Sequence, residues 1–197
     1  MPTADPMPQR LFQQAWPDGD YRMFQLGFVV DDLLAAARRW VEVFGVGPFH
    51  IMPRVKNSCR YRGADGTVDI HIGVAQAGPV QIELIQDFTD GPSVFHDLRD
   101  LYDANNTGFH QICTVTRDYD GKKAHYESLG YELACELTSP GQRVAFFDTF
   151  DEFGFFTEVA EEKPSFQVNL SKVSQTCADW DGTDPVRILT RDGYRTP

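Results

Sequence analysis

The sequence lacks the features that would mark a membrane-spanning or disulfide-bonded protein. No run of about 18 apolar residues occurs, so it predicts no transmembrane helix. The four cysteines are widely spaced and form no CxxC pair, which argues against a zinc knuckle and a disulfide framework. Positive charge is also scarce. Because the net charge is -11, the chain is a poor candidate for binding nucleic acid or an anionic membrane.

Residues 1–16 are polar and contain proline, without the apolar run that is typical of a signal peptide. Together with the cysteine pattern, this predicts a cytoplasmic protein. Aromatic residues are abundant, with 15 Phe and 7 Tyr, and hydrophobic residues make up 42% of the chain. A chain of 197 residues with this composition can form one large domain or two small, tightly joined modules.

Two short segments of similar design lie 75 residues apart (158 − 83), and each carries one acid among apolar residues. The first holds Glu83 and the second holds Glu158. A carboxylate among apolar residues is costly to desolvate unless a cation, a metal or a raised pKa compensates for it. The recurrence indicates that the chain is a duplication.

The order of the predicted elements supports the duplication, because a β-α-β-β-β pattern occurs twice. The first helix has Asp31 or Asp32 at its N-cap and ends at Gly45, and the second helix ends at Gly130. A polar, basic loop is predicted for residues 56–66. The first pattern has strands at 23–30, 49–55, 67–75 and 80–86 and a helix at 33–44; the second has strands at 108–116, 131–137, 143–149 and 155–160 and a helix at 118–129.

These elements predict five regions along the chain. They are an N-terminal arm (1–20), a first module (21–87), a connector (88–106), a second module (107–162) and a C-terminal tail (163–197). The connector is expected to contain a short helix around residues 94–102. The tail holds an apolar patch at residues 186–189, and it either docks as an edge strand or stays loose.

Aligning the two patterns brings four polar residues to equivalent strand positions. Gln25 in the first strand of the first module is matched with His110 in the first strand of the second, and Glu83 is matched with Glu158. Two carboxylates, an imidazole and an amide oxygen suit a hard-to-borderline divalent metal. An amide in a strand is also common as a plain hydrogen-bonding residue, so Gln25 is the least certain member.

On these residues the chain resembles the vicinal oxygen chelate superfamily, which includes glyoxalase I, methylmalonyl-CoA epimerase, extradiol dioxygenases and bleomycin-resistance proteins. The resemblance implies an α+β fold in which two βαβββ modules form an open, cupped mixed β-barrel, as in glyoxalases, around one divalent metal. The stretches that carry it are QLGFVVDD (25–32), VFG (43–45), QIELI (81–85), GFHQI (108–112) and FTEV (156–159).

The pattern of Gln25, Glu83, His110 and Glu158 is similar to the zinc-binding type of glyoxalase I. The resemblance therefore implies zinc, with cobalt, nickel, manganese and iron as alternatives. The glutathione-binding positions of glyoxalase I would fall at Val29 and Asp87, which argues against glutathione as the substrate.

The resemblance to the epimerases also implies a catalytic base on the third strand, where Asp69 matches the position of a glutamate. His71 shares a strand face with Asp69 and is the alternative. Proton transfer between two faces of a carbon needs two bases, and Glu158 would be the second.

The sequence therefore predicts a metal-dependent enzyme that acts on a carbonyl or acyl substrate by α-proton abstraction, as an epimerase or isomerase or as a glyoxalase-like lyase. The alternatives are a metal-free binding protein of the bleomycin-resistance kind and a ring-cleaving dioxygenase, which Glu83 disfavours. Aromatic residues near Glu158 indicate a hydrophobic small molecule. A homodimer is expected, and the modules pair either within one chain or across the dimer.

Overall fold

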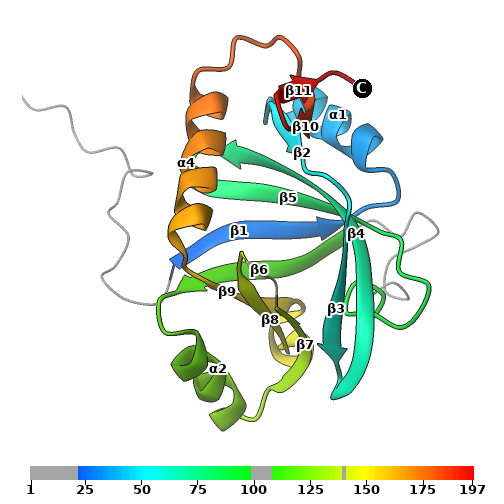
Figure 1. Cartoon of the computed structure of the whole chain (residues 1–197), viewed down its shortest axis with the longest axis vertical. Helices are drawn as coiled ribbons and strands as arrows, with labels where there is room; N and C mark the ends of the chain where they lie inside the picture. Colours follow the sequence, from blue (N-terminus) through cyan, green and yellow to red (C-terminus); the bar gives the residue numbers. More distant parts are fainter. Residues whose placement is uncertain (1–21, 99–107, 139–140) are drawn as a thin grey trace, which may run out of the picture.

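Two modules of similar design form the centre of the protein (Figure 1). The structure is a computed structural model that describes residues 22–98, 108–138 and 141–197. The first module contains β1 (Arg22–Val29), α1 (Leu33–Phe44), β2 (Phe49–Ile51), β3 (Val55–Tyr61), β4 (Ala64–Ala77) and β5 (Val80–Asp87). The second contains β6 (Gly108–Thr116), α2 (Tyr119–Ser128), β7 (Glu132–Thr138), β8 (Arg143–Asp148), α3 (Phe150–Phe153) and β9 (Phe156–Glu161). The C-terminal region adds α4 (Pro164–Ala178), β10 (Val186–Thr190) and β11 (Gly193–Arg195).

Eight of the strands form a ring. The hydrogen-bonded order β4-β3-β7-β8-β9-β6-β1-β5 is closed by the pairing of β5 with β4. The modules join within the chain at two seams, where β1 pairs with β6 and β3 pairs with β7, both antiparallel. The mixed α+β barrel of two modules predicted from the sequence is thereby confirmed.

The two module helices begin and end at signals that the sequence contains. The side chain of Asp32 accepts a hydrogen bond from the N–H of Ala35 at the start of α1, and Asp118 does the same for Gly121 in α2. Helix α1 ends at Gly45, which adopts a left-handed conformation with φ 65°. These caps fix where each helix leaves the preceding strand.

The prediction of a loop at residues 56–66 is wrong. Most of this segment forms β3 and the start of β4, which pair as an antiparallel hairpin. The polar residues of β3 misled the prediction. Exposed and partly covered side chains alternate along this strand, and the more covered face includes Cys59. The strand predicted at 49–55 is limited to Phe49–Ile51.

Other predicted regions have mixed outcomes. Residues 94–98 of the connector form turns in place of the expected helix, and residues 99–107 and the N-terminal arm lie outside the described residues. The C-terminal region contains a helix that was not expected, α4. The apolar patch forms β10, which docks parallel to β2 as the first of the two alternatives proposed for the tail.

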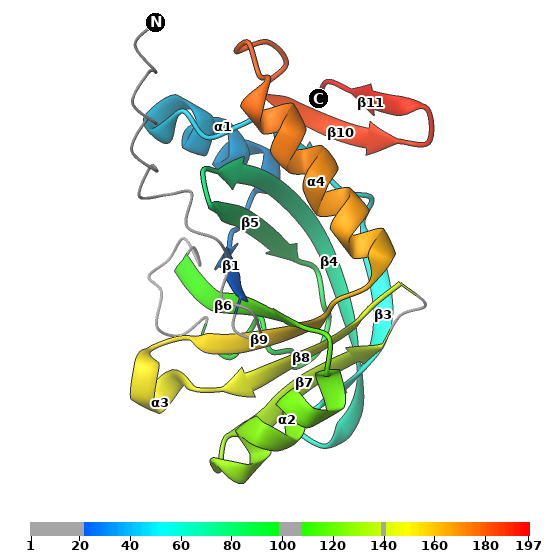
Figure 2. The same cartoon turned by 90° about the vertical axis from the view of Figure 1, so that its left-hand side faces the viewer.

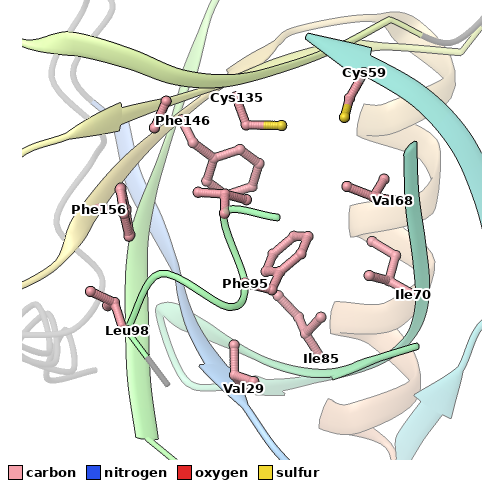
Figure 3. Packing of buried hydrophobic residues seen from close by; sticks show 12 residues of the cluster. Val29, Cys59, Val68, Ile70, Ile85, Phe95, Leu98, Cys135, Phe146 and Phe156 are labelled. Carbon is pink, nitrogen blue, oxygen red and sulfur yellow. The ribbon is translucent and has the colours of Figure 1, made fainter. Parts of the chain in front are cut away.

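Connector residues fill part of the ring. Residues 93–98, called the inner segment below, place Val94, Phe95 and Leu98 inside the barrel, where each is no more than 3% exposed. Figure 3 shows Phe95 among side chains from strands of both modules. Asp87 holds the inner segment, because its carboxylate accepts a hydrogen bond from Ser93 and contacts His96 Nε2 at 2.7 Å.

Helix α4 runs alongside the barrel toward the β10–β11 hairpin (Figure 2). Phe166 and Leu170 of α4 pack against an apolar layer that contains Phe24, Val115 and Ala160. No helix within the described ranges combines the length and apolarity that crossing a bilayer requires.

Phe95→Ala should lower the free energy of unfolding by about 3–5 kcal/mol, because it leaves a cavity at the centre of the barrel. Phe153→Ala is the control, since Phe153 is 52% exposed, and it should cost less than about 1 kcal/mol. Urea unfolding of both variants measures the difference. Equal losses would contradict the role assigned to the inner segment.

Candidate functional site

Glu83 and Glu158 face the interior of the ring from equivalent strands. Glu83 in β5 pairs with Gly27 in β1, and Glu158 in β9 pairs with Cys113 in β6. In each module the last strand therefore lies beside the first, and the two strands are parallel. Glu158 is 8% exposed, while Glu83 keeps part of its surface accessible. The two acids that the sequence singled out therefore come together.

The structure changes which residue is equivalent to Gln25. Gln25 precedes the helix cap Asp32 by seven residues (32 − 25), and Gln111 precedes the cap Asp118 by seven (118 − 111). Each glutamine also follows a residue that has no partner across the β1–β6 seam, because the pairing shifts once near each end of the seam. The equivalent of Gln25 is therefore Gln111, and the alignment of Gln25 with His110 was one residue out of register.

The side chain of Gln111 lies between the two acids. Its Nε2 donates to Glu83 Oε2 at 3.0 Å and to Glu158 Oε2 at 3.3 Å. Gly27 makes room for it, because a Cβ atom on Gly27 would lie 2.3 Å from Cδ of Gln111. Gln111 was missed from the sequence, although counting back from the helix cap would have identified it.

The two carboxyl groups are difficult to charge together. Burial raises the pKa of Glu83 well above its ordinary value and the charge of Glu158 raises it further, while the hydrogen bond from Gln111 opposes both effects. Burial raises the pKa of Glu158 to about 7, against the opposing contacts of Cys113 and Gln111. The pair therefore needs a proton or a cation for its stability.

His110 lies next to this pair but faces the inner segment. Its Nε2 contacts the carbonyl of Val94 at 2.9 Å, and its Nδ1 contacts Oε1 of Gln111. The ring stacks on Phe156, with the centroids 5.1 Å apart. Burial lowers the pKa of His110, which favours a neutral ring with a single N–H.

A neutral His110 that donates from Nε2 has an acceptor at Nδ1. An amide rotated by 180° would donate to this Nδ1 and would turn its oxygen toward Glu83 and Glu158. That oxygen can accept from a protonated carboxyl group or contribute to a cation site. Gln111 can therefore link the protonation of the acids to His110.

Gln25 makes a different contact from the one expected. Its Nε2 donates to Oε1 of Gln81 at 2.8 Å, and both side chains are buried. Nε2 of Gln81 has no hydrogen-bond partner among the described residues. Gln81 gave no signal in the sequence, because an amide in a strand is commonplace.

The donor set fits a divalent cation in its charge and chemistry. A cation of charge +2 would balance two carboxylates, and the amide oxygens of Gln25 and Gln111 are ligands of the same hard type. The described residues contain no group of three or more His, Cys, Asp and Glu arranged to hold a metal. Any site here would therefore use amide oxygens, and ligation by Gln25, Glu83, His110 and Glu158 stays a prediction.

Asp69 and His71 do not reach the acid pair. In the regular pairing of β4 with β5, Val74 lies opposite Glu83. Side chains alternate along a strand, so the even-numbered residues of β4 share the face of Glu83 and the odd-numbered Asp69 and His71 point to the other face. The two-base scheme does not agree with this geometry.

Asp69 is instead engaged by Arg54, whose Nε and Nη2 lie 2.6 and 2.9 Å from its two oxygens. This contact lowers the pKa of Asp69, and a carboxylate with a lowered pKa is a weak base. Asp69 lines a separate cavity of about 530 Å³ together with Thr67 and Phe88.

The ring of two repeated modules and its paired internal acids define a glyoxalase-like protein. The family described as Glyoxalase/Bleomycin resistance protein/Dioxygenase superfamily matches residues 24–146. The chain belongs to this superfamily, and the resemblance found in the sequence is confirmed. No curated protein sequence matches the chain.

Solved structures of the same fold are similar over most of the chain. Methylmalonyl-CoA epimerase from Mycobacterium tuberculosis has a TM-score of 0.54 and 16% identity, over 80% of this chain and 98% of that chain. Hypothetical protein BH1468 from Bacillus halodurans C-125 has a TM-score of 0.51 and 14% identity, over 72% of this chain and 94% of that chain. At these identities the similarity shows the fold alone.

The metal-free protein should become less stable as the pH rises from 4.5, the ordinary pKa of a glutamate, to about 7, the pKa of Glu158 in the folded protein. In this window the folded state holds a proton that the unfolded state has lost, so stability falls with rising pH. Glu158→Gln should make the free energy of unfolding less dependent on pH, removing roughly 2–3 kcal/mol of its decrease across this window. Urea unfolding in chelator at a series of pH values tests it, and identical pH slopes for variant and parent would rule it out.

Proposed function

We propose that the protein is a metal-dependent enzyme that transfers a proton at the α-carbon of a carbonyl or acyl compound. The observation that carries the proposal is the pair Glu83 and Glu158, joined by Gln111 inside the barrel. An apolar environment of this kind raises carboxyl pKa values toward neutrality, where a general base is most effective. The superfamily and the similarity to an epimerase structure support an enzyme.

Glu83, Glu158 and the amide oxygens of Gln111 and Gln25 would hold the metal. The expectation of zinc depended on the imidazole of His110. An all-oxygen donor set favours a harder cation such as magnesium or manganese, so we propose one of these in place of zinc. When bound, such a cation polarises a carbonyl oxygen and stabilises the charge that develops on it.

The residues of the chain supply the remaining chemistry. Glu158 takes the proton from the α-carbon onto a carboxylate oxygen and returns it, which makes the scheme a one-base transfer. In the metal-free protein Gln111 joins the two carboxyl groups through its Nε2, and after rotation of the amide it would present its oxygen to the metal between them. Phe146 and Phe156 flank Glu158 on the inner face and exclude water from the reacting carbon.

A metal-free binding protein is the second candidate. Val94, Phe95 and Leu98 fill part of the barrel, and the amide of Gln111 together with a proton on one acid can stabilise the pair without a metal. If so, the interior of the barrel would bind a ligand without catalysing a reaction. Metal analysis separates the two candidates, while a homodimer and a cytoplasmic location stay predictions.

Gln111→Leu should weaken the binding of manganese by at least about 10-fold, because it removes an oxygen ligand from between the acids. His110→Phe is the matched control, since an apolar ring can keep the stacking on Phe95 and Phe156. Equilibrium dialysis with manganese, magnesium and zinc measures the affinities. Loss of metal in His110→Phe alone would restore His110 as the ligand.

Glu158→Gln should slow exchange of the α-proton with solvent by about 10²–10⁴-fold, because the general base is removed. Deuterium wash-in on 2-substituted acyl and 2-hydroxycarbonyl compounds measures the rate in manganese-loaded protein. Asp69→Asn, on the other face of β4, should leave the rate unchanged. If Asp69→Asn is as slow as Glu158→Gln, the one-base scheme is wrong.

A further inference from the structure

Another cavity lies outside the barrel, between α4 and the strands that extend the sheet, and its wall is mainly apolar with several polar side chains. We call it the α4 groove. It has a volume of about 330 Å³, which lies at the small end of the range for sites that hold small molecules. The polar residues that line it are His50, Asn169, Lys172, Thr176, Arg187 and Tyr194.

The topology brings these residues together from three parts of the chain. His50 in β2 pairs with Arg187 in the neighbouring β10, so the two side chains share one face of the sheet. Tyr194 in β11 pairs with Leu189 of β10 on the same face. Asn169, Lys172 and Thr176 follow one another at helical spacing, which places them on one side of α4.

The charge of the groove is opposite to that of the protein. The chain has a net charge of -11, yet the side chains lining the groove include Lys172 and Arg187 and no acid. Within the described residues, neither cation forms an ion pair with a carboxylate. Asp181 interacts electrostatically with Arg187, and Asp184 Oδ2 accepts a hydrogen bond from Tyr194 at 3.0 Å, so the charge of Arg187 is partly balanced. The remaining positive charge in this concave site attracts anions.

Arg187 is already fixed in place. Its Nε donates to the carbonyl of Asp184 at 3.1 Å, its Nη2 donates to the carbonyl of Thr183 at 3.3 Å, and it lies 4.7 Å from the ring centroid of Tyr194. These contacts leave other N–H groups of the guanidinium free for a ligand. A fixed guanidinium suits the paired oxygens of a carboxylate or phosphate.

His50 provides an independent indication of a ligand. It is 7% exposed, and its Nδ1 has no hydrogen-bond partner among the described residues. Burial lowers the pKa of His50 and the charge of Arg187 adds to this, against the opposing backbone contacts of Val74 and Pro48, and the lowered pKa favours a neutral ring. A buried polar atom without a partner is uncommon in folded proteins. Since the single N–H of the neutral ring serves a backbone carbonyl, Nδ1 is an acceptor, and a hydroxyl or other donor on a ligand in the groove would satisfy it.

We propose that the α4 groove binds a small organic anion, with a carboxylate or phosphate head group held by Arg187 and Lys172. The apolar side chains of Met52, Val173 and Leu189 also line the groove and would contact an apolar body. The site is separate from the acid pair in the barrel, so it does not depend on the reaction proposed there.

Isothermal titration calorimetry with benzoate, phenyl phosphate, inorganic phosphate and benzyl alcohol tests the proposal. At least one of the two aromatic anions should bind, more tightly than inorganic phosphate, and benzyl alcohol should not bind. Stronger binding of benzoate or of phenyl phosphate identifies the head group. Failure of both aromatic anions to bind at millimolar concentration would overturn the proposal.

Lys172→Met should weaken the binding of the preferred anion by about 10-fold or more, as expected for loss of a charged hydrogen bond. Arg187→Lys should have a comparable effect while it keeps a positive charge. Arg195→Gln is the matched control. The substitution removes one positive charge, as Lys172→Met does, but Arg195 lies on the other face of the β10–β11 hairpin. An equal loss in Arg195→Gln would show attraction by charge alone and would also overturn the proposal.

Discussion

The antiparallel pairing of β1 with β6 is the contact on which the rest of the structure depends. It joins the first strands of the two modules along their length, and each of these strands carries the last strand of its own module on its other edge. This arrangement places Glu83 and Glu158 on either side of the seam. The pairing shifts near both ends of the seam, and the glutamines that follow, Gln25 and Gln111, lie at related positions.

The acid pair imposes an electrostatic constraint on the interior. Glu158 is mostly buried among aromatic side chains, and one amide from Gln111 serves both acids. Two carboxylates in such a place repel each other, so at neutral pH a stable barrel needs either a proton or a cation there. Proton transfer and metal binding both use this same constraint, which connects the packing of the barrel to its proposed chemistry.

The C-terminal region packs against the barrel and also builds the α4 groove. Helix α4 covers the apolar layer near Phe24 and Val115, while its other side faces β2 and β10. Trp180, which follows α4, lies against Gly47, where a Cβ atom would be 3.1 Å from the indole ring. The groove therefore depends on contacts between segments more than 100 residues apart in the sequence.

The sequence by itself determined the duplication, the two helices with their caps and the two acids, because these depend on local spacing and residue type. It did not reveal the shift of strand pairing at His110, which is why His110 was aligned in the place of Gln111. An unpaired residue interrupts the alternation of side-chain faces along a strand, and although the spacing from the helix caps agrees with it, the shift itself is seen only in the pairing of β1 with β6. Tertiary structure also decided the face of Asp69 and the convergence of His50, Lys172 and Arg187, since no local pattern fixes which distant strand or helix a side chain will meet.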